Sequence, residues 1–196
     1  MKLLAPDAPE LAPADGLTVA RAHVEAALPG GAAHEAARKQ ILDFVDRHPD
    51  ALHRSCLTGH LTGSAMVVDP ATRRFLFMHH VKMDRWLQPG GHADGDAALP
   101  GVALREATEE TGVLGLRVAA PAIDLDVHLI PAGKDPEHLH LDSRYLVIAP
   151  PGAVATGNHE SHDLRWAGLD ELGALDLDEG TVRLAERALE ALPLVL

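Results

Sequence analysis

Three glutamates lie near the middle of the chain at spacings that a helix would bring onto one face. Glu106, Glu109 and Glu110 are three and four residues apart, and side chains at these spacings are helical neighbours. At roughly 100° per residue, Glu110 falls about 20° and Glu106 about 60° from Ala103 in the apolar stripe of the same segment. Like charges at this spacing repel, and partial burial makes each ionised carboxylate costlier. A hard divalent cation with oxygen ligands would remove both penalties.

A simpler interpretation fits the same acidic residues. A solvated helix face, with Arg105 pairing to Glu109 at i, i+4, would also give this pattern, and charge runs are commonly surface features. The residues that flank the acids bear on the choice between these two interpretations.

The order of residues from Gly91 to Val113 resembles the signature of the Nudix hydrolases. That signature is G-x5-E-x7-R-E-U-x-E-E-x-G-U, where U is aliphatic. The matching positions are Gly91, Arg105, Glu106, Glu109, Glu110, Gly112 and Val113. Gly112 is also the residue type expected at a left-handed helix C-cap.

Two positions depart from the signature. Ala97 stands where the first glutamate is expected, and Ala107 is small for an aliphatic position. In the family, the first glutamate mostly braces the motif by pairing with the arginine, while the later glutamates hold the metal. We expect Asp96 to begin the helix as its N-cap and to reach Arg105, with Pro100 in the first turn, where its missing N–H is not needed.

The resemblance implies a chemistry and a set of ligands. It implies hydrolysis of a nucleoside diphosphate linked to another moiety by a metal-activated water, with Mg²⁺ as cofactor and Mn²⁺ as a substitute. Arg105 would brace the glutamates, and Glu106 or Glu109 could orient or deprotonate the water. The implied metal ligands are the Gly91 carbonyl, Glu106, Glu109 and Glu110.

A further acid lies far along the chain. Many family members use a glutamate on a late loop, six residues before a tryptophan, as an extra metal ligand or base, and Glu160 lies six residues before Trp166. The resemblance therefore adds Glu160 to the catalytic and metal-binding candidates. The alternative is an ordinary loop carboxylate.

The thirteen histidines raise the question of a zinc site. Those around the motif or on a late strand are His79, His80, His92, His138 and His140. No HExxH sequence or paired Cys/His spacing supports zinc binding. Contact with substrate phosphates or a base, together with Lys82, Arg85 and Arg144, is the preferred interpretation.

Composition limits the partners. A formal charge of −12 disfavours long nucleic acids, and an acidic enzyme acting on phosphates would need a cation between itself and its substrate. Cys56 is the only cysteine, so no intrachain disulfide can form and a cytoplasmic location is expected. No apolar run suggests a membrane span, and the first residues, broken by Pro and Asp, do not suggest a signal peptide.

The chain is expected to contain two parts. Residues 1–56 would be an N-terminal tail and helical extension, in which residues 17–54 have a helical pattern whose apolar positions predict one amphipathic helix. Residues 57–196 would be the Nudix domain. Its expected strands cover residues 60–69, 73–81, 86–88, 116–120, 123–130, 138–149 and 164–166, and helices are expected over 170–175 and 178–192. The predicted fold class is α/β, an α/β/α sandwich around a mixed sheet, as the resemblance implies.

Two other functions remain open. A catalytically silent Nudix domain that senses a nucleotide would account for Ala97. A Nudix-fold isomerase of prenyl diphosphates would require a catalytic cysteine, for which Cys56 is the only candidate. The expected partner is a small nucleotide, with no membrane, and the resemblance leaves a homodimer open.

Overall fold

Strand β2 (Gly59–Asp69) runs through the middle of an eight-stranded sheet in the computed structural model, which describes residues 1–196. It pairs in parallel with β7 and antiparallel with β3 and β5, so the sheet is mixed. The order across the sheet is β1 (Lys2–Leu4), β6 (Arg117–Ile130), β7 (His138–Ile148), β2, β3 (Arg74–His80) and β4 (Arg85–Leu87), with β5 (Gly90–His92) on β2 and β8 (Ser161–Ala167) on β3.

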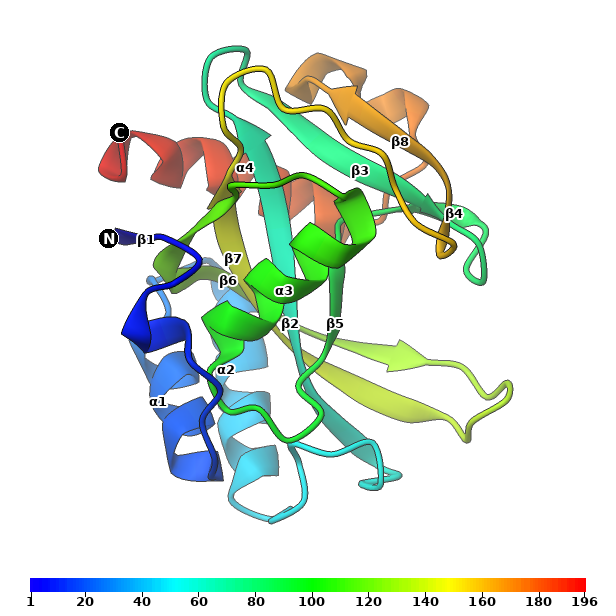
Figure 1. Cartoon of the computed structure of the whole chain (residues 1–196). Coiled ribbons are helices and arrows are strands. Elements are labelled where there is room, and N and C mark those ends of the chain that lie inside the picture. Colours follow the sequence, from blue (N-terminus) through cyan, green and yellow to red (C-terminus); the bar gives the residue numbers. More distant parts are fainter.

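Each face of the sheet is covered by helices (Figure 1). Successive strand residues point to opposite faces, and in β2 Ala65 and Val67 join a core with helix α3 (Leu99–Thr111). Met66 and Val68 join a second core with helix α4 (Glu179–Ala191). The predicted α/β/α sandwich around a mixed sheet is therefore confirmed.

The helical region expected over residues 17–54 contains two helices instead of one. Helix α1 (Leu17–Ala26) and helix α2 (Ala32–Val45) are separated by a segment that includes Pro29, Gly30 and Gly31, residues that interrupt a helix. The amphipathic face predicted for α2 is present, since its buried residues are His34, Ala37, Ile41, Phe44 and Val45.

The N-terminal residues share the core of the main domain. Strand β1 pairs with β6, and Leu4, Val24 and Ile41 belong to the same apolar cluster as α3. The extension therefore packs on the main domain. None of the helices combines the length and apolar character needed to cross a membrane.

The expected strands lie close to the observed ones with one merger, while β1 and β5 were not predicted. The runs expected at 116–120 and 123–130 form the single strand β6, whose register against β7 shifts between Ala119 and Asp124. The run expected at 170–175 is a 3-10 helix (Leu169–Ala174), and shorter 3-10 turns occur at Pro9–Leu11 and Leu192–Leu194. Asp178 caps α4 by accepting a hydrogen bond from the Thr181 N–H at 2.7 Å.

Candidate metal site and the adjoining cavity

Helix α3 carries the glutamates and has defined ends. It ends at Gly112, whose φ of 67° is the left-handed conformation expected of a glycine C-cap. It begins at Leu99 with Ala98 as N-cap, so the predicted N-cap role of Asp96 is wrong by two residues. A long-range contact explains the difference, because the Asp96 Oδ1 accepts a hydrogen bond from the Ala14 N–H at 3.1 Å as well as from the Ala98 N–H at 2.9 Å.

Asp96 also reaches Arg105, as predicted. Its Oδ2 lies 3.5 Å from Nη1 of Arg105, while Nη2 of the same guanidinium lies 3.2 Å from Oε1 of Glu106. Ala97 is fully buried, and its methyl side chain cannot form an ion pair with Arg105. Asp96 therefore supplies a carboxylate to Arg105 beside the position where the signature has its first glutamate.

Glu110 is the most buried of the three helical glutamates, with 4% of its surface exposed. The backbone N–H of Gly90 donates a hydrogen bond to Oε2 of Glu110 at 2.9 Å, which favours the ionised form. Burial opposes this and, with the negative charges of Glu106 and Glu160, raises the pKa of Glu110 to about 8. A carboxylate held in this environment gains from any nearby positive charge.

Glu106 lies against Gly91. A Cβ atom at position 91 would be only 2.4 Å from Oε2 of Glu106, so any larger residue there would displace the Glu106 carboxylate. Burial raises the pKa of Glu106, and the charges of Glu109 and Glu160 add to the effect despite the opposing Arg105. Of the three acids that the helical spacing was expected to place on one face, Glu106 and Glu110 border the buried stripe, whereas Glu109 is exposed.

The late loop brings Glu160 to the same place. Its charge raises the pKa values of both Glu106 and Glu110, which identifies it as their neighbour. Asn158 ties the loop to α3: its Oδ1 accepts from the Glu160 N–H at 2.7 Å, and its Nδ2 donates to the Glu109 carbonyl at 3.1 Å. Asn158 could not be recognised from the sequence, because its contacts depend on where the loop lies.

The donor set fits a hard cation. Carboxylate oxygens from Glu106, Glu109, Glu110 and Glu160, with a backbone carbonyl at Gly91, are the ligand types that Mg²⁺ and Mn²⁺ prefer. No three of these acids bring oxygen atoms within 4.8 Å of one another, as expected of like charges. A cation at this place would stabilise the ionised carboxylate of Glu110, which is buried beside Glu106 and Glu160.

A cavity of about 970 Å³ adjoins this site on the α4 side of the sheet. Gly90 and Gly91 line it, so the strand that contacts the glutamates also forms part of its wall. Lys82 and Arg85 line it as exposed cations.

Arg144, predicted to contact substrate, is 3% exposed and is surrounded by carboxylates. These belong to Asp142 at 2.8 Å, Asp126 at 3.0 Å and Asp124 at 3.6 Å.

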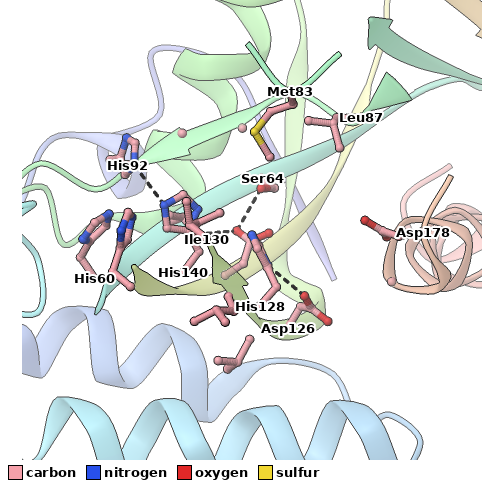
Figure 2. A pocket seen from close by; sticks show the side chains of 18 of the residues that line it. His60, Ser64, Met83, Leu87, His92, Asp126, His128, Ile130, His140 and Asp178 are labelled. Atoms are coloured by element: carbon pink, nitrogen blue, oxygen red, sulfur yellow. Dashed lines mark hydrogen bonds and ion pairs between the residues drawn. The ribbon is translucent and has the colours of Figure 1, made fainter. Parts of the chain in front are cut away.

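The candidate histidines divide into two groups. His92, His138 and His140 lie together in the cavity, where Nε2 of His92 is 3.3 Å from Nε2 of His140 (Figure 2). Burial lowers the pKa of His92 to about 4 and that of His140 to about 2. His80 accepts a hydrogen bond from the Lys82 N–H at 3.0 Å, and His79 packs on Trp86, so these two are not part of the group.

Two histidines of the cavity were missed, His60 on β2 and His128 on β6. Each lies two residues from another cavity-lining residue, His60 from Thr62 and His128 from Asp126. That period-two spacing places each histidine on the same strand face as a polar residue, but it does not show which face lines the cavity. Cys56 is 3% exposed, and burial raises the pKa of its thiol. A protonated thiol is a poor nucleophile, which weighs against the isomerase alternative.

The comparisons with known proteins agree with the fold. The model of the NUDIX domain matches residues 60–188. A binary complex of the C. elegans Ap4A hydrolase has a TM-score of 0.56 at 16% identity, covering 68% of this chain and 97% of that chain. RenU, a Nudix hydrolase from M. smegmatis, has a TM-score of 0.50 at 18% identity, covering 70% of this chain and 88% of that chain. Among curated protein sequences there was no match. At these identities the structural similarity establishes the fold, and the family match, which spans most of the chain, establishes that it belongs to the Nudix family of hydrolases.

Proposed function

We propose that this protein hydrolyses the pyrophosphate bond of a nucleoside diphosphate linked to another moiety, with Mg²⁺ as cofactor and Mn²⁺ as a substitute. The observation that carries the proposal is the environment of Glu110. This carboxyl is buried, accepts a hydrogen bond from Gly90, and has its pKa raised to about 8 by burial and by its acidic neighbours. Burying an ionised carboxylate beside other acids costs free energy, and a bound cation would offset that cost.

The ligands would be Glu106, Glu109, Glu110 and Glu160, with the carbonyl of Gly91. A bound divalent cation would neutralise charge on the phosphate oxygens and lower the pKa of a water molecule. Glu106 or Glu109 would orient that water or accept its proton. Arg105 would hold Glu106 in position through the contact at 3.2 Å.

The substrate would occupy the adjoining cavity. Its volume of about 970 Å³ is at the upper end of the roughly 300–1,000 Å³ typical of ligand sites, and suits a nucleotide with a second group attached. Because Gly90 and Gly91 line both the cavity and the glutamate site, the pyrophosphate would lie across β5. Lys82 and Arg85, exposed in the cavity wall, would contact its negative charge.

The test is a substrate panel with Mg²⁺ and with Mn²⁺. It would include nucleoside triphosphates, ADP-ribose, nucleotide sugars, dinucleoside polyphosphates and coenzyme A, with release of nucleotide or phosphate as the readout. We expect hydrolysis of at least one compound, abolished by EDTA. Binding of a nucleotide without turnover of any compound would instead support the sensing domain that Ala97 suggested.

The cytoplasmic location and the homodimer stay predictions. The buried, unpaired Cys56 is compatible with a reducing compartment. Cell fractionation would test the first, and light scattering of the purified chain would test the second.

A further inference from the structure

Five neighbouring histidines line the cavity and are called here the histidine cluster. They come from four strands and are His60 on β2, His92 on β5, His128 on β6, and His138 and His140 on β7. The centroid of the His140 ring lies 5.0 to 5.4 Å from those of the other four rings. In Figure 2 the side chains of His60, His92 and His140 point toward one another.

Strand register produces the cluster. His60 is paired with His140 across the parallel β2–β7 ladder, and His128 is paired with His140 across the antiparallel β6–β7 ladder. His138 is two residues before His140 and therefore shares its face. His60, His138 and His140 bring one ring nitrogen each within 4.8 Å of one another.

His60 lacks any hydrogen-bond partner. It is 4% exposed, and neither Nδ1 nor Nε2 meets a donor or acceptor. A neutral imidazole carries one N–H donor and one lone pair, and burying both without partners is unfavourable. A metal ion coordinated by one of these nitrogens would satisfy the lone pair.

Two other members of the histidine cluster have one nitrogen fixed by an acceptor. Nδ1 of His138 lies 2.7 Å from the carbonyl oxygen of Pro136, which can only accept, so this nitrogen carries the proton. Nδ1 of His128 lies 3.1 Å from Oδ2 of Asp126 in the same relationship. In both residues Nε2 keeps a free lone pair. Histidines that bind metals are commonly oriented in this way by a carbonyl or carboxylate.

We propose that His60, His138 and His140 bind a transition-metal ion of the Zn²⁺ class, with an open coordination position toward the cavity. Three histidine ligands with an open position are typical of zinc sites that act on a bound molecule. When no other molecule is bound, the neighbouring His92 fills that position, since its Nε2 is 3.3 Å from that of His140, about the separation of two nitrogens on one tetrahedral ion.

This nitrogen site differs from the glutamate site in chemistry and in position. Imidazole ligands suit zinc, copper and nickel, while carboxylates suit magnesium and manganese. The two sites also lie on opposite sides of β5, because Gly91 contacts Glu106 whereas the next residue, His92, faces His140. Zinc-class binding here therefore does not depend on the proposed hydrolysis.

Titration of the tag-free, metal-free protein with Co²⁺ tests the proposal, with visible absorption and calorimetry as readouts. Co²⁺ replaces zinc in nitrogen sites and absorbs strongly only when tetrahedral. We expect one tight equivalent with that spectrum, displaced by Zn²⁺, and at least about 100-fold weaker binding in the double variant His138→Ala/His140→Ala. Circular dichroism of the metal-free variant would verify its fold. His138→Ala alone, at the partly exposed start of β7, replaces the double variant if that fails to fold.

Two matched variants complete the experiment. Glu106→Gln/Glu110→Gln, which removes the oxygen site, should keep the tetrahedral Co²⁺ spectrum, and so should His53→Ala, an exposed histidine outside the histidine cluster. No tetrahedral Co²⁺ in the wild type, unchanged binding in the folded histidine variant, or loss of the spectrum in the glutamate variant would each overturn the proposal.

Discussion

The backbone N–H of Gly90 donates a hydrogen bond to Oε2 of Glu110 at 2.9 Å, joining the strand before the acidic loop to the last turn of α3. This bond fixes the carboxyl group against the wall of the cavity. It also favours the charged form, yet burial dominates and the pKa is about 8. The protein alone therefore stabilises the charged form of Glu110 poorly, and a bound cation would stabilise it.

The first prediction concerns the pH dependence of metal-free stability. Glu110 has a pKa raised from 4.5 to about 8, so its contribution to stability is present below about pH 4.5 and is lost as the pH rises through about 8. In EDTA, the wild type should lose up to about 4 kcal/mol of unfolding free energy over this range through Glu110 alone. Glu110→Gln, which keeps an acceptor for Gly90, should remove most of that loss.

Urea unfolding at pH 5 and pH 8.5 measures this effect. Glu110→Gln should be more stable than the wild type at the higher pH and about equal at the lower one. Glu137→Gln, at an exposed carboxylate, is the control and should follow the wild type. Equal pH slopes for Glu110→Gln and the wild type would show that Glu110 is not held as described.

A second prediction concerns the departure at Ala97. Restoring the signature with Ala97→Glu should destabilise the chain by about 3 kcal/mol, because position 97 is fully buried and its N–H is bonded to the carbonyl of Ala14. Thermal unfolding compares it with Ala71→Glu at an exposed turn, which should change little. A stable Ala97→Glu protein would mean that this loop can rearrange to the usual family geometry.

Asn158 should act by positioning Glu160. Asn158→Ala removes the contacts to the Glu160 N–H and to the Glu109 carbonyl, so we expect kcat to fall about 10- to 100-fold with KM little changed. His159→Ala, at the exposed neighbouring position, should leave kcat intact. Steady-state kinetics on the substrate found in the panel measures both variants, and equal activity of the two would show that Asn158 does not position Glu160.

The buried ion network predicts a large stability effect. Arg144→Met leaves the buried Asp142 without its cationic partner, which should cost about 3–5 kcal/mol. Arg117→Met, at an exposed position on β6, should stay within about 0.5 kcal/mol of the wild type. Denaturant unfolding would distinguish this structural role from a phosphate-binding role, in which Arg144→Met would raise KM and leave stability unchanged.

The placement of the glutamates on the helix was largely predictable because its geometry is local. The spacing from Gly91 to Val113 lies within one loop and one helix, so helical periodicity alone brings Glu106 and Glu110 to the buried face. The start of that helix was not predictable in the same way. It depends on the contact between Asp96 and Ala14, which belongs to the distant N-terminal segment.

The histidine cluster shows the opposite case. His138 and His140 share a face by their spacing, but their meeting with His60 and His128 depends on the register of three strands. Register follows from the packing of whole strands against two cores and cannot be derived from a local pattern. For the same reason Arg144 could be recognised as a charged strand residue, while its three aspartate partners could not.

The most direct test of the oxygen-ligand site is Mg²⁺-dependent hydrolysis by the wild type, Glu109→Gln and Glu110→Gln, each verified as folded by circular dichroism. We expect turnover by the wild type, a loss of orders of magnitude in both variants, and weaker Mg²⁺ binding in calorimetry. Full activity in both folded variants would contradict the assignment of these glutamates as the catalytic metal ligands.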